Sequence, residues 1–221
     1  RVTVLTGFKP DHDHFAKGYS VTPAAPYAAG LVCLPRAREA ARALIAAAAA
    51  EVAPGGLVVV DGQKTDGIDT ALKDLRARVD LSESLSKAHG KLASFMAGPD
   101  LSDWAAMPRQ IEGGFQTLPG VFSADGPDRG SVLLAQALLA KFGGKVADLG
   151  AGWGYLARAI LAHPGVKRLD LVEAEADALA CARVNITDER ARFHWADATG
   201  FRPDTLLDAV VMNPPFHVGR D

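Results

Sequence analysis

The stretch that most constrains the fold is VADLGAGWGYLARA, residues 146–159. A short apolar run leads into three alternating glycines, Gly150, Gly152 and Gly154, and apolar residues at helical spacing follow. This order predicts a buried strand, a tight turn and a helix. Glycine at such positions permits the turn and lets the backbone approach a ligand at the start of the helix. The pattern therefore predicts a nucleotide-binding unit of an α/β fold.

The second half of the chain continues the same alternation of strands and helices. We predict strands at 145–150, 168–175, 191–197 and 206–213, and helices at 131–142, 154–163 and 176–186. The strand segments are rich in apolar residues, which is typical of strands buried on both faces of a parallel sheet. The sequence therefore predicts a doubly wound, Rossmann-type domain.

The first half shows a fainter version of this pattern. We predict strands at 2–8 and 55–62 and helices at 36–52 and 67–79, but no glycine-rich nucleotide turn follows either strand. We expect residues 1–107 to form a degenerate α/β domain with an RNA-binding or stabilising role, and residues 108–221 to form the cofactor-binding domain. Both ends of the chain look cut, so we expect the sheet of the second domain to be truncated and its C-terminal part to be missing.

Composition narrows the class of protein. Apolar residues make up 48% of the 221 residues and the formal charge is -2, so the chain can bury a core and is not a polycation. Nucleic-acid binding would need a local basic face, and the basic residues near 36–42 and 73–78 are interpreted first as solvated helix faces. Cys33 and Cys181 lack a partner motif, and no stretch resembles a membrane span or signal peptide. These features predict two buried free thiols and a cytoplasmic location.

One acidic residue precedes the glycine turn, and another ends each of the next two predicted strands. A dinucleotide site directs helix N–H groups at a pyrophosphate, but the spacing here is G-x-G-x-G and Asp148 precedes it, where a carboxylate would oppose a phosphate. This arrangement suits a positively charged ligand such as S-adenosylmethionine. Glu173 ends the next strand, where it can accept hydrogen bonds from both ribose hydroxyls. Asp197 ends the strand after that and can accept from the adenine amino group, beside the backbone N–H of Ala198.

The last predicted strand runs into Asn-Pro-Pro-Phe, residues 213–216. A residue before proline is held extended, and prolines offer carbonyl groups without N–H donors. Asn213 and Pro214 would therefore present acceptors, and Phe216 would present a flat apolar wall. Such a pocket suits a planar group bearing an –NH₂, whose lone pair two acceptors would direct toward a methyl donor.

These motifs carry a family resemblance. DLGAGWG, VEAE, WADAT and NPPFH resemble the cofactor and catalytic motifs of class I S-adenosylmethionine-dependent methyltransferases, and with LPGVFSADGPDRGSVLLAQAL they resemble the bacterial ribosomal RNA guanine-N2 methyltransferases of the RsmC type. The resemblance implies two tandem methyltransferase-like domains, the first degenerate, and a ribosomal RNA or ribosomal subunit as partner. It implies cofactor contacts at Asp148, Gly150, Ala151, Gly152, Glu173, Ala174, Asp197 and Ala198, and catalytic contacts at Asn213, Pro214 and Phe216.

Alternative functions stay open at this point. Similar Asn-Pro-Pro-aromatic turns also serve transfer to adenine 6-amino groups and to glutamine side-chain amides. In a second alternative, the first half makes the chain an RNA-binding module with little catalytic activity. His12 and His14 alternate with aspartates in DHDHF, but no further ligand cluster accompanies them, so we predict a polar loop and no metal site. The target nucleotide and the oligomeric state do not follow from the sequence.

Overall fold

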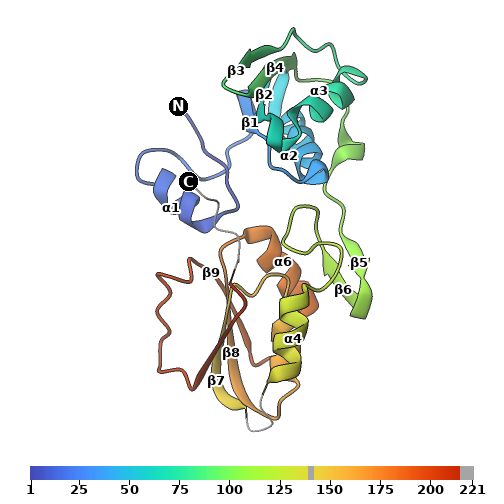
Figure 1. Cartoon of the computed structure of the whole chain (residues 1–221). Coiled ribbons are helices and arrows are strands. Elements are labelled where there is room, and N and C mark those ends of the chain that lie inside the picture. Colours follow the sequence, from blue (N-terminus) through green and yellow to red (C-terminus); the bar gives the residue numbers. More distant parts are fainter. Residues whose placement is uncertain (139–141, 215–221) are drawn as a thin grey trace. The chain divides into compact units, whose positions relative to one another are not determined.

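The computed structural model describes residues 1–138 and 142–214, and contacts divide the chain into two compact units (Figure 1). The small unit is Pro23–Met107, and the large unit joins Arg1–Thr22 to Pro108–Asp221. The predicted division put all of residues 1–107 in one domain. The first 22 residues differ from that expectation because their backbone bonds to the large unit, where the N–H of Lys9 donates to the carbonyl of Ala174 at 2.8 Å. Among the described residues, no helix is both long and apolar enough to cross a membrane.

The small unit is a mixed sheet with helices packed on it. Its strands are β1 (Tyr27–Cys33), β2 (Val52–Gln63), β3 (Leu85–Lys87) and β4 (Gly90–Met96), in the order β1-β2-β4-β3. β1 and β2 are parallel, whereas β4 runs antiparallel to β2 and to β3. Helices α2 (Arg38–Glu51) and α3 (Ile68–Arg76) bury Ile45, Leu72 and Leu75 against the sheet. The unit is therefore α/β, as predicted, but its sheet is not wholly parallel.

Three sequence expectations for the first half of the chain need correction. Cys181 is buried, but Cys33 is exposed on β1. Residues 2–8 form only isolated bridges, at Thr3 and Phe8, rather than a strand. The segment expected to be a polar loop at 11–15 belongs to helix α1 (Lys9–Phe15), whose first turn holds a proline. Proline is well tolerated there because the first turn has no intrahelical partner for its N–H.

The large unit is built on a four-stranded parallel sheet in the order β10-β7-β8-β9. These strands are β7 (Gly143–Leu149), β8 (Gly165–Glu173), β9 (Ala191–Trp195) and β10 (Ala209–Met212). Helices α4 (Arg129–Ala137), α5 (Tyr155–Leu161) and α6 (Ala176–Asn185) pack on one face around a core that includes Ile160, Leu169 and Leu171. A short hairpin of β5 (Arg109–Ile111) and β6 (Phe115–Thr117) precedes them. The predicted Rossmann-type α/β fold is confirmed.

The strand order creates a switch point in this sheet. The chain continues from β7 to β8 and β9 on one side, and then returns to place β10 on the other side of β7. In open α/β sheets, ligands bind outside the carboxyl ends of the strands where the order reverses. The glycine turn follows β7 and the Asn-Pro turn follows β10, so both lie at this point.

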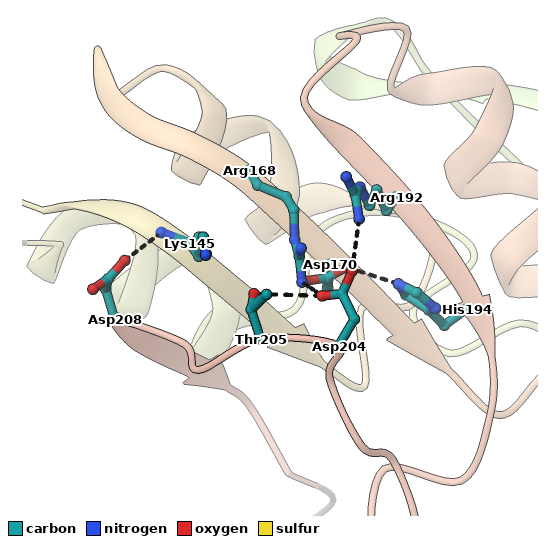
Figure 2. Close-up of polar contacts among 8 residues, drawn as sticks. All are labelled: Lys145, Arg168, Asp170, Arg192, His194, Asp204, Thr205 and Asp208. Atoms are coloured by element: carbon teal, nitrogen blue, oxygen red, sulfur yellow. Dashed lines mark hydrogen bonds and ion pairs between the residues drawn. The ribbon is translucent and has the colours of Figure 1, made fainter.

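A polar network holds the connection between β9 and β10 on the other face of the sheet (Figure 2). Asp170 is 1% exposed and accepts from the Nε of Arg168 at 2.9 Å, and its other oxygen lies 2.8 Å from the Nε2 of His194. Arg168 also contacts Asp204 at 2.6 Å, and Arg192 contacts the same carboxylate at 3.2 Å. Because Asp204 belongs to the loop that begins at Asp197, the network fixes that loop to β8 and β9.

Candidate active site

The glycine turn between β7 and α5 has the conformation that its sequence requires. Gly150, Gly152 and Gly154 have φ values of 74°, 54° and 94°, in the region that other residues adopt only with strain. A Cβ atom at Gly150 or Gly152 would meet nothing within 4 Å, so the backbone there faces open space. The turn therefore leaves room for a ligand directly beyond β7.

Asp148 is the most unusual side chain of the site. It is fully buried, and neither of its oxygens has a hydrogen-bond partner among the described residues. Its neighbours in the sheet are Leu171 and Val211, and burial together with the nearby charge of Glu173 raises its pKa to about 7. Buried polar groups without partners are rare in folded proteins and call for an explanation, of which a missing ligand is one. Here the orphaned carboxylate lies two residues before the open glycine turn.

The next two strand ends carry the other acidic candidates. The carboxylate of Glu173 accepts from the N–H of Gly152 and from the N–H of Glu175, both at 2.8 Å. Each oxygen of an ionised carboxylate has a second lone pair, so this side chain can still accept from a ligand. Asp197 accepts from the N–H and the hydroxyl of Thr199, both at 2.8 Å. The three acidic residues thus lie at or just beyond the carboxyl ends of three neighbouring strands, at one edge of the sheet.

Asn213 joins this edge from β10. Met212 pairs with Leu149, which places Asn213 beside the glycine turn that begins at Gly150. The side-chain nitrogen of Asn213 donates to Asp128 at 2.9 Å and to the hydroxyl of Ser131 at 2.8 Å. Pro214 follows it and is exposed. The predicted aromatic wall at Phe216 lies outside the described residues.

The structure thus brings the predicted residues to one edge of one sheet. The candidates at or just beyond the carboxyl ends of β7, β8, β9 and β10 are Asp148, Gly150, Ala151, Gly152, Glu173, Ala174, Asp197, Ala198, Asn213 and Pro214. Their individual contacts with a cofactor or an acceptor stay predictions. Residues 112–221, which contain this whole edge, match the model of the methyltransferase small domain family. This segment is a methyltransferase small domain.

Similarity to known proteins extends beyond the methyltransferase small domain. The chain is 33% identical over 209 residues to ribosomal RNA small subunit methyltransferase C of Pseudomonas aeruginosa (strain LESB58), covering 89% of the chain and 62% of that protein. The protein of the same name from Psychromonas ingrahamii is 31% identical over 203 residues, covering 86% and 58%. A solved 16S rRNA N2 methyltransferase of T. thermophilus, determined with AdoMet and guanosine, matches 99% of the chain and 66% of its own chain, with a TM-score of 0.81 and 25% identity. The chain therefore spans about three fifths of the length of the curated relatives that it matches.

Several residues that shape the edge of the methyltransferase small domain were not predicted from the sequence. Asn185, at the end of α6, bonds through its side-chain amide to both backbone groups of Gln116 and to the carbonyl of Trp153 in the glycine turn. The indole N–H of Trp195 donates to the carbonyls of Gly7 and Ala174. These bonds link positions up to 188 residues apart, so no local pattern reports them.

Proposed function

We propose that the chain is the methyl-transferring part of an S-adenosylmethionine-dependent enzyme that modifies the exocyclic 2-amino group of a guanine in small-subunit ribosomal RNA. The observation that carries the proposal is the buried carboxylate of Asp148, which lies at the switch point of the sheet and has no hydrogen-bond partner within residues 1–138 and 142–214. A site built for a phosphate would not place an unpaired carboxylate there. The relatives named as small-subunit rRNA methyltransferases support the acceptor class.

The residues present fit S-adenosylmethionine. When bound, this cofactor supplies a methyl group activated by a positively charged sulfonium. Asp148 would favour the positive charge and supply an acceptor for the ammonium group, and the turn at Gly150, Ala151 and Gly152 would admit the ligand without a side-chain clash. Because opposite charge favours the ionised form of a carboxylate, binding would lower the raised pKa of Asp148.

The other two strand ends would hold the nucleoside part of the cofactor. Glu173 keeps a free lone pair on each oxygen for the ribose hydroxyls, and Ala174 follows it in the same turn. Asp197 would accept from the adenine amino group, beside the N–H of Ala198. The bonds of Glu173 to the turn backbone hold it in place before the cofactor arrives, which lowers the entropic cost of binding.

Asn213 and Pro214 would act on the acceptor. The side-chain oxygen of Asn213 and the carbonyl of Pro214 would accept the two hydrogens of the guanine amine, and this draws its lone pair out of conjugation with the ring. The nitrogen becomes more acidic as positive charge develops on it, so its proton can leave to water without a strong base. Alignment and preorganised acceptors would supply most of the rate acceleration. Phe216, in the proposed role of a stacking wall, would hold the base.

A methyl-transfer assay on ribosomal subunits tests this function. Small subunits from cells that lack the equivalent methylation would be incubated with the protein and radiolabelled S-adenosylmethionine, and the RNA would be digested to nucleosides. We expect the label in N2-methylguanosine. Label in N6-methyladenosine, or in the glutamine amide of a release factor supplied in parallel, would instead support one of the alternative acceptors.

We further propose that the small unit contributes to RNA binding in the bacterial cytoplasm. Lys64, Lys87, His89 and Lys91 line a shallow hollow of about 280 Å³ around the β3–β4 turn. Lys91 is paired with Asp69, but Lys64 and Lys87 have no ion-pair partner among the described residues. By contrast, Arg38, Arg42 and Arg78 pair with Asp74 and Asp103, so these three arginines hold segments of the small unit together.

Two charge-neutralising changes test this role. Lys64→Gln with Lys87→Gln should weaken binding to a small-subunit rRNA fragment and reduce the salt dependence of the affinity, because each lost phosphate contact lowers the slope by about 0.9. Cofactor affinity should stay unchanged. Equal RNA affinity for the variant and the unmodified protein would assign the small unit a stabilising role instead.

A further inference from the structure

The contact between Asn213 and helix α4 determines which end of its amide faces the acceptor. The nitrogen of an asparagine side chain carries two hydrogens, and its oxygen carries none. Both neighbours at the start of α4 accept from this nitrogen: Asp128 at 2.9 Å and Ser131 at 2.8 Å. A carboxylate cannot donate, so the nitrogen must face Asp128. The oxygen of Asn213 is then left without a hydrogen-bond donor among the described residues.

The carboxylate of Asp128 is itself held in place by the start of α4. Asp128 is the N-cap residue, and it accepts from the backbone N–H of Ser131 at 3.0 Å. This bond and the bond from Asn213 lower the pKa of Asp128, so the group is ionised at neutral pH. Helix N-termini favour negative charge, which adds to the same effect.

The glycine between Asp128 and Ser131, Gly130, permits the Asn213 side chain to approach the start of α4 closely. A Cβ atom at Gly130 would lie 2.9 Å from a carboxylate oxygen of Asp128 and 3.2 Å from the side-chain oxygen of Asn213. Any other residue at this position would force the Asp128 carboxylate to shift and would crowd the Asn213 side chain. The DRGS segment at 128–131 is therefore shaped to receive the amide.

We propose that Asp128 and Ser131 are positioning residues for methyl transfer, because they fix the amide of Asn213 with its oxygen toward the acceptor amine. This inference rests on the proposed function. The ionised carboxylate also polarises the amide through the N–H that it receives, and hydrogen bonds in such chains strengthen one another. The oxygen of Asn213 thereby becomes a stronger acceptor as positive charge develops on the amine.

The test uses substitutions that keep the helix start intact. Asparagine is as good an N-cap as aspartate, so Asp128→Asn removes the charge while preserving the cap. We expect the single-turnover rate at saturating cofactor and RNA to fall about tenfold to a hundredfold, with the Kd values of both ligands unchanged. Ser131→Ala should lower the same rate by a smaller factor. Asp125→Asn is the matched control, because that carboxylate is 90% exposed and does not contact Asn213, and its rate should stay unchanged.

A double-substitution cycle separates positioning from a general structural effect. In an Asn213→Ala background, Asp128→Asn should cause no further loss of rate, because the amide that it orients is gone. A further loss as large as that in the unsubstituted protein would overturn the proposal. So would a full rate for Asp128→Asn alone in a preparation that methylates ribosomal RNA.

A spectroscopic readout keeps the inference separate from the proposed function. The two side-chain N–H signals of Asn213 should be protected from solvent exchange in the protein and should lose protection in Asp128→Asn. This measurement needs no substrate. If the unsubstituted protein methylates no guanine, the proposed function fails, but the protection of the amide still tests the contact between Asn213 and Asp128. Equal solvent exchange of the Asn213 side-chain N–H groups in the parent and in Asp128→Asn would overturn the positioning role.

Discussion

Replacing Asp148 with asparagine should make the large unit more stable at neutral and alkaline pH. Burial, and to a lesser extent the charge of Glu173, raises the pKa of Asp148 from 3.8 to about 7. A group whose pKa is higher in the folded state contributes stability that is present below its unfolded pKa and is lost as pH rises through the folded value. At about 1.36 kcal/mol per pKa unit, the charged form of Asp148 costs the folded state about 4 kcal/mol.

The assay measures how the effect of Asp148→Asn changes with pH. Urea unfolding without cofactor would be followed by tryptophan fluorescence in a Trp104→Phe background, so that Trp153 and Trp195 report on the large unit. The free energy of unfolding of the variant, minus that of the parent, should grow by about 4 kcal/mol between pH 4 and pH 8. Any constant effect of the new amide cancels in this comparison.

Asp188 provides a control because its pKa is lowered in the folded state, whereas that of Asp148 is raised. Its hydrogen bonds from Arg190 lower its pKa to about 2, so its stabilising contribution is complete above pH 4 and is lost only on acidification. The effect of Asp188→Asn should therefore stay constant from pH 5 to pH 8. A pH-independent effect of Asp148→Asn over the same range would refute the reasoning, because it would mean that Asp148 is ionised without penalty.

Three other outcomes follow from the same contacts. As the pH is raised toward 7, the cofactor affinity of the parent should increase by up to about tenfold per pH unit, whereas that of Asp148→Asn should not change with pH. Calorimetry would measure both affinities, and an equal pH dependence in the two proteins would contradict the cation-binding role. Asp170→Ala should lower the free energy of unfolding by about 3–5 kcal/mol, because it breaks a buried ion-paired network. The side chain of Asp204 is 60% exposed, so Asp204→Ala should lower the free energy of unfolding by at most about 1 kcal/mol. Trp195→Phe should raise the cofactor Kd severalfold with an unchanged saturated rate, and an unchanged Kd would show that its indole bonds do not position the cofactor loops.

Local patterns were enough to predict the order of strands β7 to β10 and helices α4 to α6 and the edge that carries the site, but not helix α1 or the β5–β6 hairpin of the same unit. The glycine turn was predictable because the positive φ values of Gly150, Gly152 and Gly154 leave few alternatives to glycine. The acidic residues at strand ends followed from the strand positions, since parallel strands end at a shared edge.

The remaining features depend on contacts between distant segments, which sequence patterns do not report. The first 22 residues join the large unit through backbone bonds and through the Trp195 indole, and no residue type marks such bonds. Asp128 is the N-cap residue of α4, and its contact with Asn213, 85 positions later, forms only in the folded sheet. The sheet of the small unit is not wholly parallel because β4 pairs antiparallel with β2. The apolar pattern of a strand does not determine whether it pairs parallel or antiparallel.

The comparison of Asn213→Ala with Glu173→Ala tests the central claim most directly. The measurement is the single-turnover rate of methyl transfer at saturating cofactor, beside the cofactor Kd of each variant. Loss of the Asn213 oxygen should lower the rate about a hundredfold to a thousandfold and leave the Kd almost unchanged, because this side chain faces the amine. Loss of the Glu173 carboxylate should raise the Kd and largely preserve the saturated rate. If Asn213→Ala weakens cofactor binding as much as Glu173→Ala and keeps its saturated rate, the assignment of Asn213 to the acceptor amine is contradicted.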